Sequence, residues 1–151
     1  MAVLARALLI FFVASCTGFG PDPARAEGLC DGLSLVLEKW PEVPASQPWQ
    51  AGEGKTCRYL KELSGPLFLC QWDHDLQDPA AQAHFDRLSQ DLEVCFGFGA
   101  TMVSDQRVNH PDSYLLRQFE VREKVISLSL KDKSALGRTI VFLRVQAPDP
   151  K

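Results

Sequence analysis

The residues best suited to chemistry are the histidines, of which the chain has three. His74 lies between two aspartates in Asp73-His74-Asp75, and His84 follows within the next predicted helix. A histidine beside carboxylates can act as a general acid or base, or can bind a metal ion together with them. The spacing matches neither His-x-His nor the HExxH motif of metalloproteases. The sequence therefore predicts no metal site and no cofactor.

The third histidine belongs to the densest polar cluster, Asn109-His110-Pro111-Asp112-Ser113-Tyr114. This cluster ends a long predicted loop, and binding residues tend to lie on such loops. No GxSxG motif accompanies it, and Asn and Pro favour turns without any catalytic role. We expect binding roles here and at an exposed tryptophan, a residue over-represented at binding hot spots. The candidate binding residues are Trp49, Asn109, His110, Asp112 and Tyr114.

An enzymatic alternative uses some of the same residues. In this alternative the protein is a small periplasmic hydrolase or metal-dependent enzyme that acts through His110 with Asp112, or through His74 with Asp75. Convergence of such a pair in a concave pocket would favour an enzyme, and side chains that face apart would argue against one.

Two amphipathic helices and several strands must position these residues. Residues 28–40 and 79–95 have apolar side chains at helical spacing, and the second helix begins with Asp78 as a cap and Pro79 in the first turn. Apolar runs and alternation predict strands at residues 56–62, 67–72, 114–123, 124–130 and 138–145, with a short strand considered at 100–103.

The order of these elements, α-ββ-α-βββ, predicts the fold class. Consecutive strands joined by short turns form antiparallel sheets, and amphipathic helices each need one face covered. We expect an α+β domain in which both helices pack on one face of a mostly antiparallel, about five-stranded sheet. The other face would be partly solvated and open to a partner.

The first 26 residues have the pattern of a cleavable export signal. Residues 7–13 are unbroken apolar sequence, too short for a membrane span of about 20 residues but typical of a signal peptide. Ala24-Arg25-Ala26 supplies the small-x-small pattern that a signal peptidase accepts. The sequence predicts cleavage after Ala26 and a single mature domain at 27–151 without a transmembrane segment. The expected destination is the periplasm of a Gram-negative bacterium, or secretion.

The same segment contains an alternative processing site. Val13-Ala14-Ser15-Cys16 resembles the bacterial lipobox, in which the cysteine is lipidated and becomes the first residue of the mature protein. Under this alternative the protein is an envelope lipoprotein, anchored to the membrane by the lipid on Cys16.

The cysteine count fits an oxidising compartment. The chain has five cysteines, and either kind of processing removes Cys16 from the pool. The four that remain favour two disulfides, and their spacing excludes CxxC redox or zinc motifs. Pairing two aromatic residues across the predicted hairpin sets Cys57 opposite Cys70. We predict the disulfides Cys57–Cys70 and Cys30–Cys95.

The charge of the chain argues against one class of partner. The net charge is −3 and no long run of Lys or Arg occurs, so we expect no nucleic-acid partner. Together with the lack of a catalytic motif, this predicts a non-enzymatic exported module that binds another protein through the open sheet face or the 97–113 loop. Inhibitors and toxin-neutralising immunity proteins are roles that suit a domain of this size and compartment.

Overall fold

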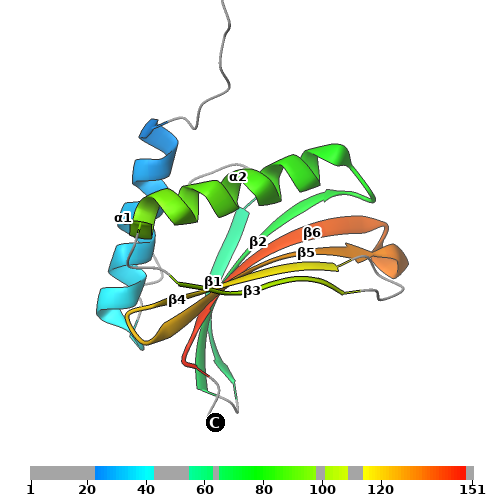
Figure 1. Cartoon of the computed structure of the whole chain (residues 1–151). Helices are drawn as coiled ribbons and strands as arrows, with labels where there is room; N and C mark the ends of the chain where they lie inside the picture. Colours follow the sequence, from blue (N-terminus) through cyan, green and yellow to red (C-terminus); the bar gives the residue numbers. More distant parts are fainter. Residues whose placement is uncertain (1–22, 43–54, 63–64, 98–100, 109–113, 149–151) are drawn as a thin grey trace, which may run out of the picture.

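The computed structural model of the protein describes residues 23–42, 55–62, 65–97, 101–108 and 114–148. Side chains are described for 27–42, 55–62, 65–97 and 115–148. Within these ranges the chain forms two long helices, six strands and a short 3-10 helix at Ser134–Leu136 (Figure 1). The helices are α1 (Pro23–Lys39) and α2 (Pro79–Phe96). The strands are β1 (Lys55–Glu62), β2 (Gly65–Asp75), β3 (Thr101–Val108), β4 (Tyr114–Val121), β5 (Lys124–Lys133) and β6 (Arg138–Gln146).

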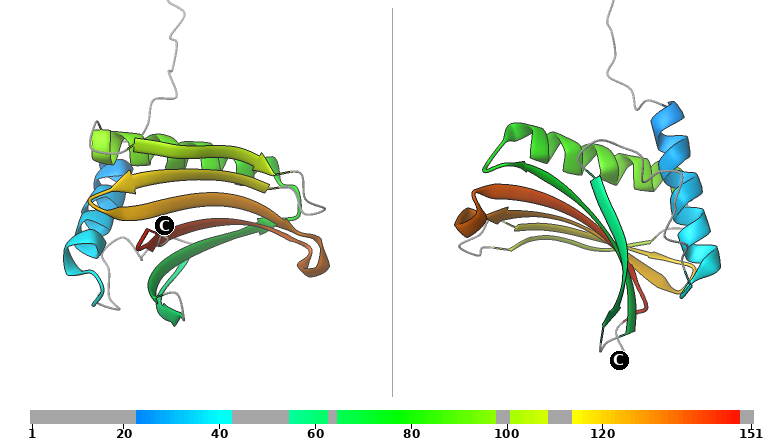
Figure 2. Two further views of the ribbon diagram at one scale, coloured as in Figure 1. Left: turned by 60° about the horizontal axis from the view of Figure 1, so that its bottom comes forward. Right: turned by 180° about the vertical axis from the view of Figure 1, so that it is seen from behind.

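The strands form one antiparallel sheet in the order β1-β2-β6-β5-β4-β3. The predicted α+β class and the order of elements are confirmed. The last strand pairs with β2 far back in the sequence, with Leu143 opposite Cys70, so β6 joins the β1–β2 hairpin to the other strands. Both helices lie on the same side of the sheet (Figure 2).

One strand adds to the expected five. The short strand expected at 100–103 is part of β3, an eight-residue edge strand that pairs with β4. Its register shifts between Met102 and Ser104. Such an irregularity breaks the strict alternation by which strands are recognised in a sequence. The full extent of β3 therefore could not be seen from the pattern.

Two turns also set strand bounds that differ from the predicted ones. Arg122 and Glu123 have φ angles of 49° and 60°, and they form the tight connection from β4 to β5. The predicted strand therefore stops at Val121 rather than continuing to Glu123. β5 continues to Lys133, which pairs with Arg138, because the 3-10 helix closes the turn with Gly137 at a φ of 62°.

Helix α2 begins and ends where its sequence indicates. The Asp78 side chain accepts a hydrogen bond of 2.8 Å from the backbone N–H of Ala80, and Pro79 occupies the first turn. Gly97 closes the helix at a φ of 49°.

Helix α1 begins at Pro23, five residues before the expected start at Gly28. Proline is favoured at a helix start, so α1 extends into the predicted signal peptide.

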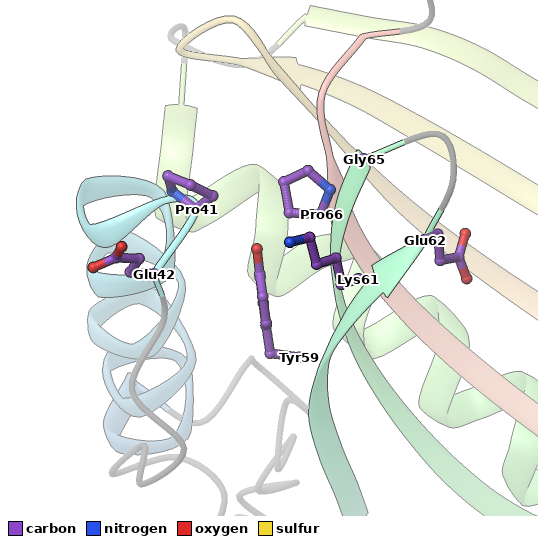
Figure 3. A pocket seen from close by; sticks show the side chains of 7 residues that line it. All are labelled: Pro41, Glu42, Tyr59, Lys61, Glu62, Gly65 and Pro66. Atoms are coloured by element: carbon purple, nitrogen blue, oxygen red, sulfur yellow. The ribbon is translucent and has the colours of Figure 1, made fainter.

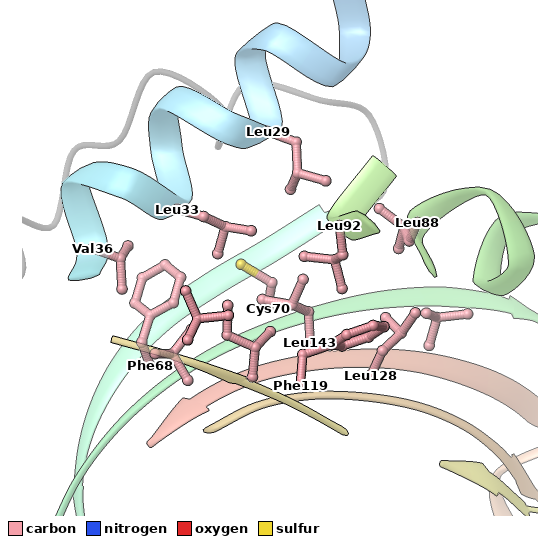
Figure 4. Packing of buried hydrophobic residues seen from close by; sticks show 14 of the residues in the cluster. Leu29, Leu33, Val36, Phe68, Cys70, Leu88, Leu92, Phe119, Leu128 and Leu143 are labelled. Atoms are coloured by element: carbon pink, nitrogen blue, oxygen red, sulfur yellow. The ribbon is translucent and has the colours of Figure 1, made fainter. Parts of the chain in front are cut away.

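The hydrophobic core lies between the two helices and the sheet face beneath them (Figure 4). Leu33 and Val36 from α1 and Leu92 from α2 are fully buried, and they pack on the strands. The principal buried residues of the sheet are Phe68, Cys70, Phe119, Ile126, Leu128, Val141, Leu143 and Val145.

Both predicted disulfides are present. Cys30–Cys95 joins α1 to the end of α2, with Cα atoms 5.0 Å apart. Cys57–Cys70 joins β1 to β2 at directly opposite positions, in the register that also sets Tyr59 opposite Phe68. Among the described residues, no helix is both long enough and apolar enough to cross a membrane.

Candidate functional site

Most of the predicted binding residues lie outside the described residues. Those that do are Trp49, Asn109, His110 and Asp112. Tyr114 is the first residue of β4, and its backbone lies between Val108 of β3 and Lys131 of β5. The binding roles of these residues therefore stay predictions, as does the His110–Asp112 pair of the enzymatic alternative.

A groove of about 610 Å³ lies between the C-terminal end of α1 and the β1–β2 hairpin (Figure 3). Its lining residues are Pro41, Glu42, Tyr59, Lys61, Glu62, Gly65 and Pro66. In Figure 3 the Tyr59 ring lies between Glu42 and Lys61. Side chains of both charge signs therefore surround an aromatic ring and two prolines.

Tyr59, the aromatic residue of the groove, packs against Trp40 at the end of α1. Tyr59 has 37% of its surface exposed, although it is a large aromatic residue. Its ring meets the half-buried ring of Trp40 edge-on, with centroids 6.3 Å apart. The Lys124 Nζ atom lies 6.0 Å from the centroid of the Trp40 ring, within reach of a cation–π interaction. These contacts hold the end of α1 against β1 and fix the wall of the groove.

The groove adjoins an edge of the sheet. Among the described strands, β1 pairs with β2 alone, so β1 is an edge strand of the described sheet. Such an edge is a template for another strand, and natural proteins protect it with charged residues. The charged residues of β1 are Lys55, Arg58, Lys61 and Glu62.

The sheet face away from the helices is a second candidate surface. Leu69 on this face is buried by its neighbours, whereas Arg144 opposite it on β6 is exposed. The Arg144 guanidinium carbon lies 5.6 Å from the centroid of the half-buried Phe142 ring. Neither α1 nor α2 covers this face (Figure 2). It is partly solvated, as expected, and carries apolar and cationic side chains side by side.

His74 does not pair with Asp75 as the enzymatic alternative requires. Consecutive strand residues point to opposite faces, so the His74 side chain faces the helices and Asp75 points away from it. The His74 Nε2 atom instead lies 3.1 Å from Nδ1 of His84 on α2. No group of three or more His, Cys, Asp or Glu side chains within metal-binding reach occurs in the described part of the chain.

Sequence comparisons with known proteins assign the chain to no family. No protein-family model matches the chain, and no curated protein is similar to it in sequence.

Sequence reasoning missed the groove, although it noticed parts of it. The aromatic pair that predicts the hairpin register includes Tyr59, but the sequence pattern assigns no binding role to it. Tyr59 and Pro41 line the same groove because Trp40, next to Pro41, packs against Tyr59 of the hairpin. The available signal was an aromatic residue among the charged residues of the first predicted strand.

Proposed function

We propose that this protein is an exported, non-enzymatic binding module that holds an extended segment of a partner protein at the groove beside β1. The observation that carries the proposal is the half-exposed Tyr59 on an edge strand, in a groove that also contains Pro41 and Pro66. Exposed aromatic residues in concave surfaces are typical binding hot spots.

The chemistry of the two neighbouring features favours an extended polypeptide. The edge of β1 offers main-chain hydrogen bonds to an added strand, which give affinity without regard to sequence. The groove beside it accepts a side chain, which gives specificity. Proline and tyrosine surfaces suit an apolar side chain, and Lys61 and Glu42 beside the Tyr59 ring can pair with charges that flank it.

The disulfides and the N-terminal sequence support an exported protein. Two disulfides in a small domain are typical of the periplasm or the extracellular space. The sequence of residues 1–26 favours export, with signal cleavage after Ala26 and lipidation of Cys16 as the alternative. An inhibitor or immunity-type protein that holds a segment of an enzyme or toxin is the specific role that we propose. Size and compartment support it by analogy.

Selection of linear peptides on the disulfide-bonded mature domain tests the proposal. Selected peptides should share an apolar residue, and Tyr59→Ser should weaken their binding by about 30-fold, which corresponds to about 2 kcal/mol for a hot-spot residue. Leu136→Ser is the matched control, because Leu136 is 66% exposed and lies on the turn between β5 and β6. The control should bind the peptides as the wild type does.

Amide chemical-shift mapping locates the bound peptide without any substitution. The proposal predicts shifts along β1 and at Glu42, with new protection of β1 amides from hydrogen exchange. Failure to select any peptide, or shifts confined to the sheet face of Leu69 and Phe142, would contradict it. The second outcome would favour the open sheet face as the binding surface.

A further inference from the structure

Two histidines from different elements meet at the opposite end of β2 from the groove. The His74 Nε2 atom lies 3.1 Å from the His84 Nδ1 atom, and the ring planes are inclined at 70°. His74 is half-buried near the end of β2, and His84 is only 6% exposed on the side of α2 that faces the sheet. One ring is therefore fixed inside the protein and the other is accessible from solvent.

The surroundings hold both rings in place. The Trp72 ring meets the His84 ring edge-on, with centroids 5.2 Å apart. Thr139 lies opposite His74 on β6 and accepts a hydrogen bond of 2.7 Å from the Gln77 backbone N–H. The same hydroxyl donates to Asp132 at 2.6 Å. The connection from β2 to α2 is thus tied to β6 and β5, which limits the freedom of His74.

The separation of the two nitrogens matches the spacing of two ligands on one metal ion. Imidazole nitrogens bound to the same ion at about 2.0–2.1 Å lie about 2.9 Å apart at a right angle and about 3.3 Å apart at a tetrahedral angle. The observed 3.1 Å lies between these values. We propose that His74 Nε2 and His84 Nδ1 together bind one divalent transition-metal ion, which is a property separate from partner binding at the groove.

The ligand chemistry decides which ions the site takes. Imidazole suits Zn²⁺, Cu²⁺ and Ni²⁺, whereas Mg²⁺ and Ca²⁺ require oxygen ligands. Two protein ligands leave the remaining positions to water, because the described residues supply no third side chain of the usual metal-binding types at this place. The ion would join β2 to α2 directly. It would raise the free energy of unfolding by an amount that grows with the ratio of the free ion concentration to its Kd.

Calorimetric titration of the untagged, disulfide-bonded protein with Zn²⁺ tests the proposal. The chain has three histidines, so His110→Ala is a matched control for His74→Ala. The wild type and His110→Ala should bind one ion, and Zn²⁺ should raise the Tm of both. His74→Ala should weaken binding by at least about tenfold, because a chelated ion loses the second, effectively intramolecular ligand. His84→Gln should have the same effect.

Two readouts on the wild-type chain keep the test independent of how the variants fold. The imidazole ¹⁵N resonances of His74 Nε2 and His84 Nδ1 should shift with Zn²⁺, while those of His110 stay unchanged. Ni²⁺ should quench the fluorescence of the neighbouring Trp72, and Trp72→Phe should remove this quenching while keeping Zn²⁺ binding. Absence of Zn²⁺ binding, unchanged binding in His74→Ala, or binding lost only in His110→Ala would each overturn the proposal. The two rings then form a hydrogen-bonded pair and no metal site.

Discussion

The Trp40 ring packs edge-on against the Tyr59 ring, with centroids 6.3 Å apart, and so joins the end of α1 to strand β1. Tyr59 lines the groove at which we propose that a partner peptide binds, and Trp40 supports its ring. The contact between the two rings connects segments that are separated in the sequence by residues 43–54, so it depends on the packing of α1 rather than on the local sequence of the hairpin.

Replacing Trp40 by Ala should therefore weaken both stability and peptide binding. The ring is only half-buried, so we expect the free energy of unfolding to fall by about 2 kcal/mol, less than for a fully buried tryptophan. Tyr59→Phe, which keeps the ring, should change stability by less than about 0.5 kcal/mol. Urea denaturation measures both changes. If Trp40→Ala binds the selected peptides with wild-type affinity, Trp40 does not support the groove.

The Thr139 hydroxyl should contribute measurably to the free energy of unfolding, because it makes two hydrogen bonds. It accepts from Gln77 N–H and donates to Asp132, and Thr139 is buried. Thr139→Val keeps the shape but leaves both partners without this hydrogen bond, so we expect a loss of about 1–3 kcal/mol. Ser134→Ala on the exposed turn is the comparison and should change stability by less than about 0.5 kcal/mol. Equal effects of the two substitutions in thermal melts would show that the hydroxyl contributes little.

The two disulfides should differ in how much they stabilise the fold. Cys30–Cys95 closes a separation of 65 residues and Cys57–Cys70 one of 13. In the chain-entropy model, these loops correspond to about 4 and about 3 kcal/mol. Paired Cys→Ala variants at each bridge, compared by denaturant unfolding, should show the larger loss for the bridge between the helices. A larger loss at the hairpin bridge would mean that local strand pairing depends on its disulfide.

Export with signal cleavage after Ala26, as we propose, predicts that intact-protein mass spectrometry of the mature protein shows Glu27 as the first residue. Cleavage after Ala26 would remove residues 23–26 from the start of α1, and the helix would then begin at Glu27. A mass that corresponds to a diacylated Cys16 would identify a lipoprotein instead. Cys16→Ala separates the two cases, since it leaves signal cleavage after Ala26 intact and abolishes lipidation.

Local patterns allowed much of the fold to be predicted. The spacing of Ala81, Phe85, Leu88 and Leu92 predicted α2, and the buried side chains of the helix include all four. The Tyr59–Phe68 pairing predicted the hairpin register and, with it, the Cys57–Cys70 bridge. These features depend on neighbours within one or two elements. Helical and strand periods directly encode such neighbours.

The sequence by itself determined the helices, the hairpin with its Cys57–Cys70 bridge and the α+β class, because apolar periodicity records which side of each element must be buried. Only the tertiary structure decided which elements meet. The pairing of β2 with β6 and the groove at Tyr59 join residues far apart in the chain, and the contact of His74 with His84 joins a strand to the helix that follows it. A hydrophobic pattern requires a face to be covered but does not name the segment that covers it, because hydrophobic burial is non-directional.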